Sequence, residues 1–132
     1  MKSKQVWRYY CDYCGKANCA KHHMKTHENH CTMNPDRYCR MCNGATKPVE
    51  LQKAIDWVWG NAVFDPEDEN YLALYDERTM MEMRRMVDDC PACILSVIRQ
   101  GRLHLIGLDF DYKKEAKEWL DEHAEERFSR HE

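Results

Sequence analysis

Six of the eight cysteines occur in three pairs with two residues between the partners. This spacing lets both thiolates of a tight turn point at one metal ion. Cysteines in a secreted chain would instead suggest disulfides. The regular spacing favours metal binding over disulfide bonds, and the pairs are Cys11/Cys14, Cys39/Cys42 and Cys90/Cys93.

The first pair is followed by two further metal-binding residue types. Twelve residues separate Cys14 from His27 and three separate His27 from Cys31, which gives C-x2-C-x12-H-x3-C. A knuckle would offer two thiolates, and a short helix would offer two ligands one turn apart, closing a tetrahedron around zinc. His30 is an alternative fourth ligand to Cys31. Four protein ligands leave no open position, so the predicted site is structural rather than catalytic.

This segment resembles the two-Cys two-His zinc finger family, with cysteine in place of the last histidine. Tyr9 occupies the family's aromatic position before the first cysteine, and Met24 occupies its leucine position. Asn18 departs from the family, which has a core aromatic there, so we expect Cys19 or Val6 to fill that space. Cys19 is otherwise expected to be a buried thiol. The resemblance implies a ββα fold for residues 1–34.

In that family the helix reads DNA through positions −1, 2, 3 and 6. Here those positions are Ala20, His22, His23 and Thr26, and Lys21 and Lys25 could bind phosphates. One finger reads only about three base pairs, so specific binding needs several fingers or a dimer. An alternative is that His22 and His23 are exposed polar helix residues without a ligand. The predicted nucleic-acid contacts are Lys21, His22, His23, Lys25 and Thr26.

The remaining two pairs, Cys39/Cys42 and Cys90/Cys93, together predict a second zinc site with four thiolates. "CRMCNG" resembles the knuckle of zinc ribbons and treble clefs, and "CPAC" resembles the treble-clef ligand pair at a helix N-terminus. The 47 residues between the pairs depart from that fold. A redox dithiol at "CPAC" is the alternative, but it would follow a βαβ pattern that the sequence lacks.

The residues after the second knuckle have helical periodicity. From Pro48 to Gly60, one face carries Leu51, Ile55 and Val58, with Ala54 beside them. A second helix is expected from Asp65 as N-cap, with Pro66 in its first turn. Its inward stripe would contain Leu72, Tyr75, Thr79, Met83 and Met86.

Three more elements are predicted towards the C-terminus. A helix should start at Cys90 and end at Gly101, and residues 103–112 should form a short strand or hairpin. Residues 111–128 predict a charged amphipathic helix. Its inward residues would be Ala116, Trp119, Leu120 and His123.

Charge is distributed unevenly along the 132 residues. Residues 1–47 carry nine Lys/Arg and three Asp/Glu, a balance of +6, whereas the remainder carries 11 and 20, a balance of −9. Only the basic head is therefore expected to meet a polyanion. Because no apolar run is long enough for a membrane span or signal peptide, we expect a cytoplasmic protein without membrane or small-molecule partners.

The layout also resembles small zinc-finger proteins of tailed phages and prophages. The matching pieces are CDYCGK at 11–16, HENHCTMNPDRYC at 27–39 and CPAC at 90–93. This resemblance implies zinc and an intracellular, host-cytoplasmic setting, without an assigned activity. "HENHC" is not expected to be an HNH nuclease, because the motif lacks a preceding Asp-His and its His27 and Cys31 are assigned to zinc.

The sequence therefore predicts a small, mainly α, zinc-stabilised protein holding two ions. A finger at 1–34 precedes a helical domain at 35–132 that the second site closes in a treble-clef-like manner. The predicted function is a non-catalytic, nucleic-acid-associated regulatory protein that also contacts a protein. The alternative is a protein-interaction adaptor or inhibitor of a host enzyme, which exposure of Trp57 or Trp59 would favour.

Overall fold

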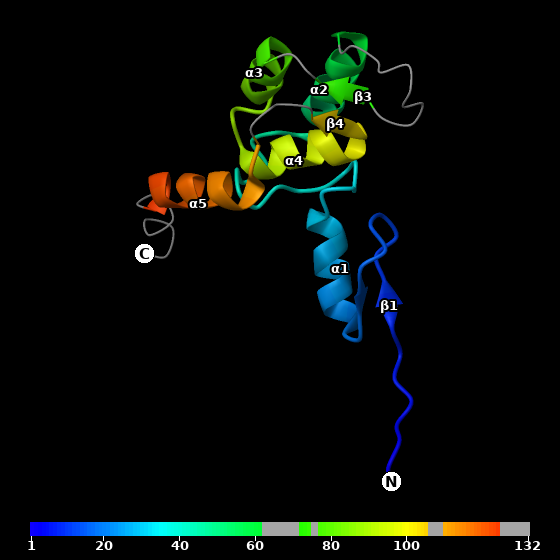
Figure 1. Cartoon of the computed structure of the whole chain (residues 1–132). Coiled ribbons are helices and arrows are strands. Elements are labelled where there is room, and N and C mark those ends of the chain that lie inside the picture. Colours follow the sequence, from blue (N-terminus) through cyan, green and yellow to red (C-terminus); the bar gives the residue numbers. More distant parts are fainter. Residues whose placement is uncertain (62–71, 75–76, 106–109, 125–132) are drawn as a thin grey trace.

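The computed structural model of the chain describes residues 1–61, 72–74, 77–105 and 110–124. The described part is small and mainly helical, with two short two-stranded sheets. Its first three elements form a unit that we call the finger, and the elements that follow, four helices and a second strand pair, form a unit that we call the body (Figure 1). Within the described residues, no helix is both long and apolar enough to span a bilayer.

The finger has the predicted strand, strand, helix order. Strand β1 (Tyr9–Tyr10) pairs antiparallel with β2 (Ala17–Asn18), and α1 (Lys21–His30) packs against both. The turn between the strands is closed where the N–H of Cys11 donates to the carbonyl of Lys16 at 2.8 Å. Gly15 adopts φ +77° in this turn, a conformation that glycine reaches without strain.

The finger core is small and centred on sulfur. Cys11, Met24 and Cys31 are buried, and Tyr9, Cys14 and Met33 pack partly buried around them. Met24 thus fills the inward position predicted from the sequence. Val6 or Cys19 was expected to fill the space that the family's core aromatic occupies at Asn18. This prediction was wrong, because both side chains are exposed. Met33 packs on the cluster.

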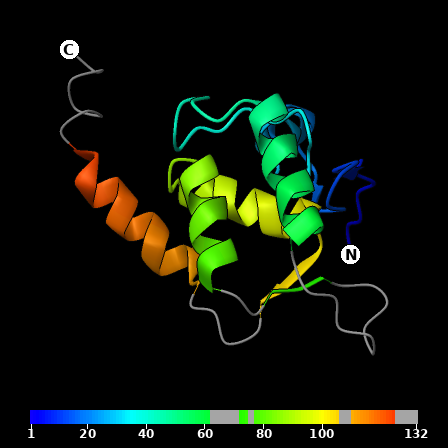
Figure 2. The same cartoon turned by 90° about the horizontal axis from the view of Figure 1, so that it is seen from above.

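Four helices and a parallel strand pair make the body, as far as the structure describes it. Helix α4 lies in the middle, with α2 and α5 both against it and α3 against α2 (Figures 1 and 2). Strands β3 and β4 pair with Leu72 opposite Leu103. The bounds are α2 Pro48–Asn61, β3 Leu72–Leu74, α3 Glu77–Met86, α4 Pro91–Gln100, β4 Leu103–Leu105 and α5 Tyr112–Glu122.

The body core forms where these helices meet. The predicted inward face of α2 is confirmed, and Val58 is fully buried. Met83 from α3 and Ile94 and Val97 from α4 are also fully buried. Each such side chain contributes about 1.5–3 kcal/mol by leaving water. This apolar contact is the core that holds the body together.

The start of the second body helix was predicted wrongly. Helix α3 begins at Glu77, and Leu72 lies in β3 rather than on a helical stripe. Thr79 and Met83 are buried as expected, and Met86 is partly buried. The β3–β4 pairing joins segments some thirty residues apart, which periodicity within one segment does not reveal. Asp65, Pro66 and Tyr75, which the prediction also placed in this helix, lie outside the described residues.

The C-terminal elements follow the prediction in part. Residues 103–105 form a strand, but it pairs in parallel with β3, so this pairing is not a hairpin. In α5, Asp111 caps the helix, Ala116 is buried and Trp119 is half-buried. Leu120, predicted to face inward, is exposed. Helix α5 lies at the edge of the body and packs against α4 (Figure 1).

A hydrogen-bonded joint connects the finger to the body. Residues 34–37 form a turn in which the N–H of Arg37 donates to the carbonyl of Asn34. The buried Asn34 side chain donates to the carbonyl of Glu28 at 2.7 Å, and Arg37 donates to the carbonyl of His30 at 3.2 Å. From α4, Gln100 donates to the carbonyls of Thr32 and Asn34. The end of α1 is therefore attached to the end of α4.

Candidate metal centres

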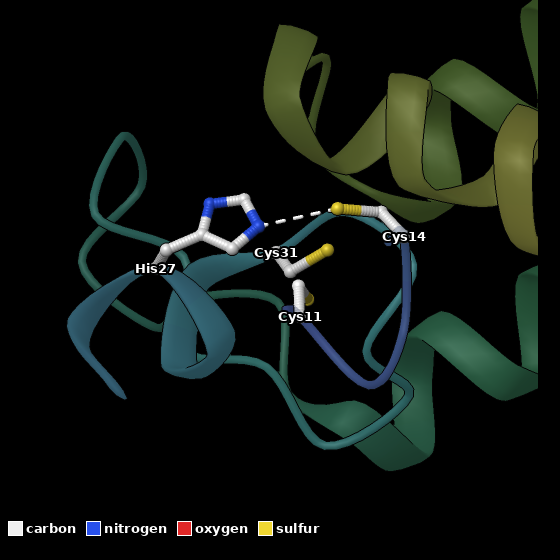
Figure 3. A group of neighbouring side chains, drawn as sticks. All are labelled: Cys11, Cys14, His27 and Cys31. Atoms are coloured by element: carbon white, nitrogen blue, oxygen red, sulfur yellow. Dashed lines mark hydrogen bonds between the residues drawn. The ribbon is translucent and has the colours of Figure 1, made fainter. Parts of the chain in front are cut away.

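The first predicted ligand set comes together at one end of the finger. Cys11 and Cys14 lie in the turn after β1, His27 lies on the last turns of α1, and Cys31 directly follows α1. The four ligand atoms lie within 4.8 Å of one another (Figure 3). Figure 3 shows the imidazole directed at the sulfur of Cys14, with the other two cysteines beside it.

The spacing of these atoms fits one tetrahedral ion. The Sγ of Cys14 lies 3.3 Å from Nε2 of His27. Zinc–sulfur and zinc–nitrogen bonds of about 2.3 and 2.05 Å would place such a pair about 3.5 Å apart. The N–H of Tyr13 also points at the Sγ of Cys11 at 3.4 Å, an orientation that stabilises a thiolate.

The protonation of the first cluster is set by competition between burial and hydrogen bonds. Burial opposes ionisation of Cys14, but the Lys16 backbone and His27 bond to its sulfur and lower its pKa to about 7. Burial, helped by the neighbouring Cys14 and Cys11, raises the pKa of Cys31 to about 11. A metal ion would therefore have to displace a tightly held proton at Cys31.

The structure resolves the choice between His30 and Cys31. Both ring nitrogens of His30 are already engaged, because Nδ1 donates to the carbonyl of Tyr38 at 2.7 Å and Nε2 accepts from Arg40 at 2.8 Å. Cys31 instead belongs to the four-residue cluster. His30 thus contributes to the joint between α1 and the second knuckle, and Cys31 is the candidate ligand.

Cys19 was predicted to be buried, and this was wrong. It is exposed in the turn between β2 and α1. There the side-chain oxygen of Asn18 accepts from the N–H of Ala20 at 2.8 Å, and this local turn leaves the intervening side chain in solvent. Cys19 belongs to neither ligand cluster.

The second ligand set joins two distant segments of the body. Cys39 and Cys42 lie in a knuckle closed by N–H bonds from Gly44 and Ala45 to their carbonyls. Cys90 is the N-cap of α4, and Cys93 lies in its first turn. The predicted helix start is thus confirmed, and the positive end of the helix dipole faces these sulfurs, which favours thiolates.

The geometry of the second cluster matches a four-sulfur site. Cys39 and Cys90 have sulfurs 3.7 Å apart, as do Cys42 and Cys93. A tetrahedral ion with bonds of about 2.3 Å to sulfur requires separations of about 3.7–3.8 Å. Disulfide bonds would need about 2.05 Å. The two sulfurs of "CPAC" lie beside the two sulfurs of the second knuckle, so the arrangement is that of a metal site with four ligands rather than an isolated dithiol.

Electrostatics in the second cluster show how crowded its sulfurs are. The neighbouring Cys42 raises the pKa of Cys39, but hydrogen bonds with Cys90 and Cys93 together lower it to about 6. Hydrogen bonds with the other three cysteines, Cys39 first, lower the pKa of Cys42. The pKa values of Cys90 and Cys93 are raised, chiefly by Cys39 and then by Cys42. Two of the four sulfurs thus ionise more easily and two hold their protons more tightly, and a divalent cation would displace those protons and neutralise the thiolate charge.

The predicted nucleic-acid contacts all lie on the outside of α1. Lys21, His22, His23, Lys25 and Thr26 are exposed, whereas Met24 between them faces the core. The rings of the two histidines are 4.1 Å apart. The Thr26 hydroxyl donates to the carbonyl of His22, one turn earlier. The structure thus brings these five side chains to one solvent-facing surface without assigning them a ligand.

Several residues that support the clusters were missed by sequence reasoning. Glu28 accepts from the N–H of Asp12 in the first knuckle at 3.0 Å. The Trp119 indole donates to the carbonyl of Met41 inside the second knuckle at 3.3 Å. Tyr112 also lies near the second cluster, where burial, then Cys39 and Cys90, raise its pKa. Their long sequence separations leave no local signal, although Trp119 was predicted to face inward.

Comparisons with protein families, curated proteins and solved structures found no match to this chain. Function is therefore inferred from the chain's own residues. The two clusters, each of four Cys or Cys/His residues, are positioned to bind one metal ion apiece.

Proposed function

We propose that the chain is a non-catalytic zinc protein whose finger binds nucleic acid. The donor sets are three thiolates with one imidazole, and four thiolates. Both sets are typical of structural zinc, and neither leaves a coordination position for substrate. The ions would hold the finger closed and tie α4 to the second knuckle. The finger would bind nucleic acid and the body would contact a protein, and the proposed regulatory role lies in joining the two.

The observation that carries the nucleic-acid proposal is the exposed basic surface of the finger. The five side chains on the outer face of α1 are all accessible to solvent. Residues 1–47 have a charge balance of +6, while the rest of the chain has −9. Figure 1 shows the finger extending from the helical body, so its positive surface is accessible to phosphates.

The direct test is fluorescence anisotropy of zinc-loaded full-length protein with a random-sequence duplex. We expect micromolar binding at about 50 mM salt that weakens steeply at about 200 mM, because phosphate binding releases counterions. Lys21→Glu/Lys25→Glu should abolish binding. The matched control is Lys113→Glu/Lys117→Glu, which makes the same charge change on exposed positions of α5. Absence of binding to any nucleic acid at low salt would refute the proposal.

A protein-interaction adaptor is the second candidate, and Trp59 favours it. Its side chain is 46% exposed although its indole donates to the carbonyl of Gly101 at 3.0 Å. Trp57 is half-buried. An exposed tryptophan is a common centre of protein interfaces. If Trp59 is such a centre, Trp59→Phe should lower the affinity for a partner captured with the intact chain while zinc content stays unchanged.

A further inference from the structure

The N-terminal part of the finger exposes three large aromatic side chains, which we call the hairpin aromatics. Trp7 is 82% exposed, Tyr10 is 61% exposed on β1, and Tyr13 is 43% exposed in the first knuckle. Tyr9 instead packs against the sulfur-rich core. Because side chains alternate along a strand, Tyr10 lies on the face of β1 opposite to Tyr9. Tyr9 therefore contributes to the finger core, whereas the rings of the three hairpin aromatics face solvent.

Basic residues are interspersed with the hairpin aromatics. Lys2, Lys4, Arg8 and Lys16 are all exposed. The salt bridges found among the described residues involve α3 and α5 and none of these four cations. A surface of rings and positive charges is complementary to a polyanion that carries flat apolar groups. A neutral protein surface would be a poorer partner, because it offers no negative groups to pair with these Lys and Arg side chains.

We propose that the hairpin aromatics form a stacking surface for the bases of a single-stranded nucleic acid. This inference rests on the proposed function and names the class of nucleic acid. Aromatic rings stack on bases only where the base faces are accessible, and in a duplex neighbouring base pairs cover them. Backbone phosphates would meet the interspersed Lys and Arg side chains.

The placement of the hairpin suits a flexible strand. Figure 1 shows β1 on the far side of α1 from α5, with the N-terminal residues running away from the body. A single strand could follow this exposed edge and reach the hairpin aromatics. A rigid duplex seated on α1 would keep the faces of its bases covered, whereas a flexible strand can bend to bring its bases onto the rings.

The test compares three labelled probes at one salt concentration with the zinc-loaded full chain. They are a fifteen-nucleotide oligothymidylate, an abasic sugar–phosphate chain of the same length, and a duplex of that length. We expect the oligothymidylate to bind at least about 10-fold more tightly than the abasic chain, since stacking contributes at each base. It should also bind more tightly than the duplex.

Variants assign this preference to the hairpin aromatics. Trp7→Ala and Tyr10→Ala should each weaken oligothymidylate binding about 5- to 100-fold and leave abasic binding unchanged. Trp7→Phe and Tyr10→Phe should retain most of the affinity, because a ring remains. The matched control is Met81→Ala, an exposed apolar residue on α3. Zinc content measured for every variant shows whether the finger is still folded.

The possible failures are distinguishable. Equal affinity for the oligothymidylate and the abasic chain, tighter duplex binding, or unchanged binding by both alanine variants would overturn stacking while the proposed function stands. Failure of all three probes to bind would overturn both.

Discussion

Gly44 in the second knuckle provides a quantitative test of how closely the chain packs beside the second metal cluster. It has φ +71°, which costs alanine about 1–2 kcal/mol. A Cβ atom there would lie 2.6 Å from Cε2 of Tyr38. The ring would have to move, and it would lose its edge contact with His30, whose centroid is 6.1 Å away. That contact adds about 1 kcal/mol, so Gly44→Ala should lower the free energy of unfolding by about 2–3 kcal/mol.

The assay is urea unfolding of the protein at a fixed free zinc concentration. Tryptophan fluorescence reports on the body, because Trp57, Trp59 and Trp119 all lie there. Gly60→Ala is the matched control, since nothing lies within 4 Å of the Cβ atom that alanine would add and its φ is not positive. We expect Gly60→Ala to leave stability unchanged or to raise it by up to about 1 kcal/mol through helix propensity.

A double-mutant cycle separates backbone strain from the ring contact. In a Tyr38→Ala background, Gly44→Ala should cost only the backbone part, which leaves a coupling energy of about 1 kcal/mol. Equal losses for Gly44→Ala with and without the Tyr38 ring would show that the close approach does not exist. A loss no larger than that of Gly60→Ala would refute the left-handed conformation as well.

Three further outcomes follow from the clusters and the joint. Metal analysis should find two zinc ions per chain, reduced to one by Cys93→Ala and unchanged by Cys19→Ala, which removes a thiol outside both clusters. Chelator competition should show zinc affinity of the finger falling as the pH decreases from 8 to 6. Binding requires the Cys31 thiolate, its pKa without metal is about 11, and protons therefore compete more strongly at low pH. Gln100→Ala removes donors to the carbonyls of Thr32 and Asn34, so urea unfolding should show a loss of about 1–3 kcal/mol.

The ligand sets were predictable because metal chemistry leaves a local signature. Cys11, Cys14, His27 and Cys31 are spaced by the geometry of one turn and one helix, so sequence separation reveals which side chains can meet. The four remaining paired cysteines could be assigned by elimination. Pro91 after Cys90 likewise marks the start of α4, because proline is favoured at the first helical position.

The errors fall where distant segments decide the outcome. Leu72 has the periodicity of the following helix, but its backbone pairs with residue 103. Leu120 is apolar and lies beside inward positions, yet its side chain is exposed on α5, at the edge of the body. Cys19 is the exception, because its error is local: the hydrogen bond from Ala20 to Asn18 closes a turn in which Cys19 is exposed. None of these contacts produces a repeating pattern in the sequence.

The wide separation of the ligands in the second cluster has a consequence during synthesis. Cys42 and Cys93 are 51 residues apart, whereas the finger ligands span Cys11 to Cys31. At about 5–20 residues per second, the second knuckle waits about 3–10 s for its partner pair to be made. The finger ligands are complete before that wait begins. The nascent chain can thus load its first ion while the thiols of the second knuckle are still without partners.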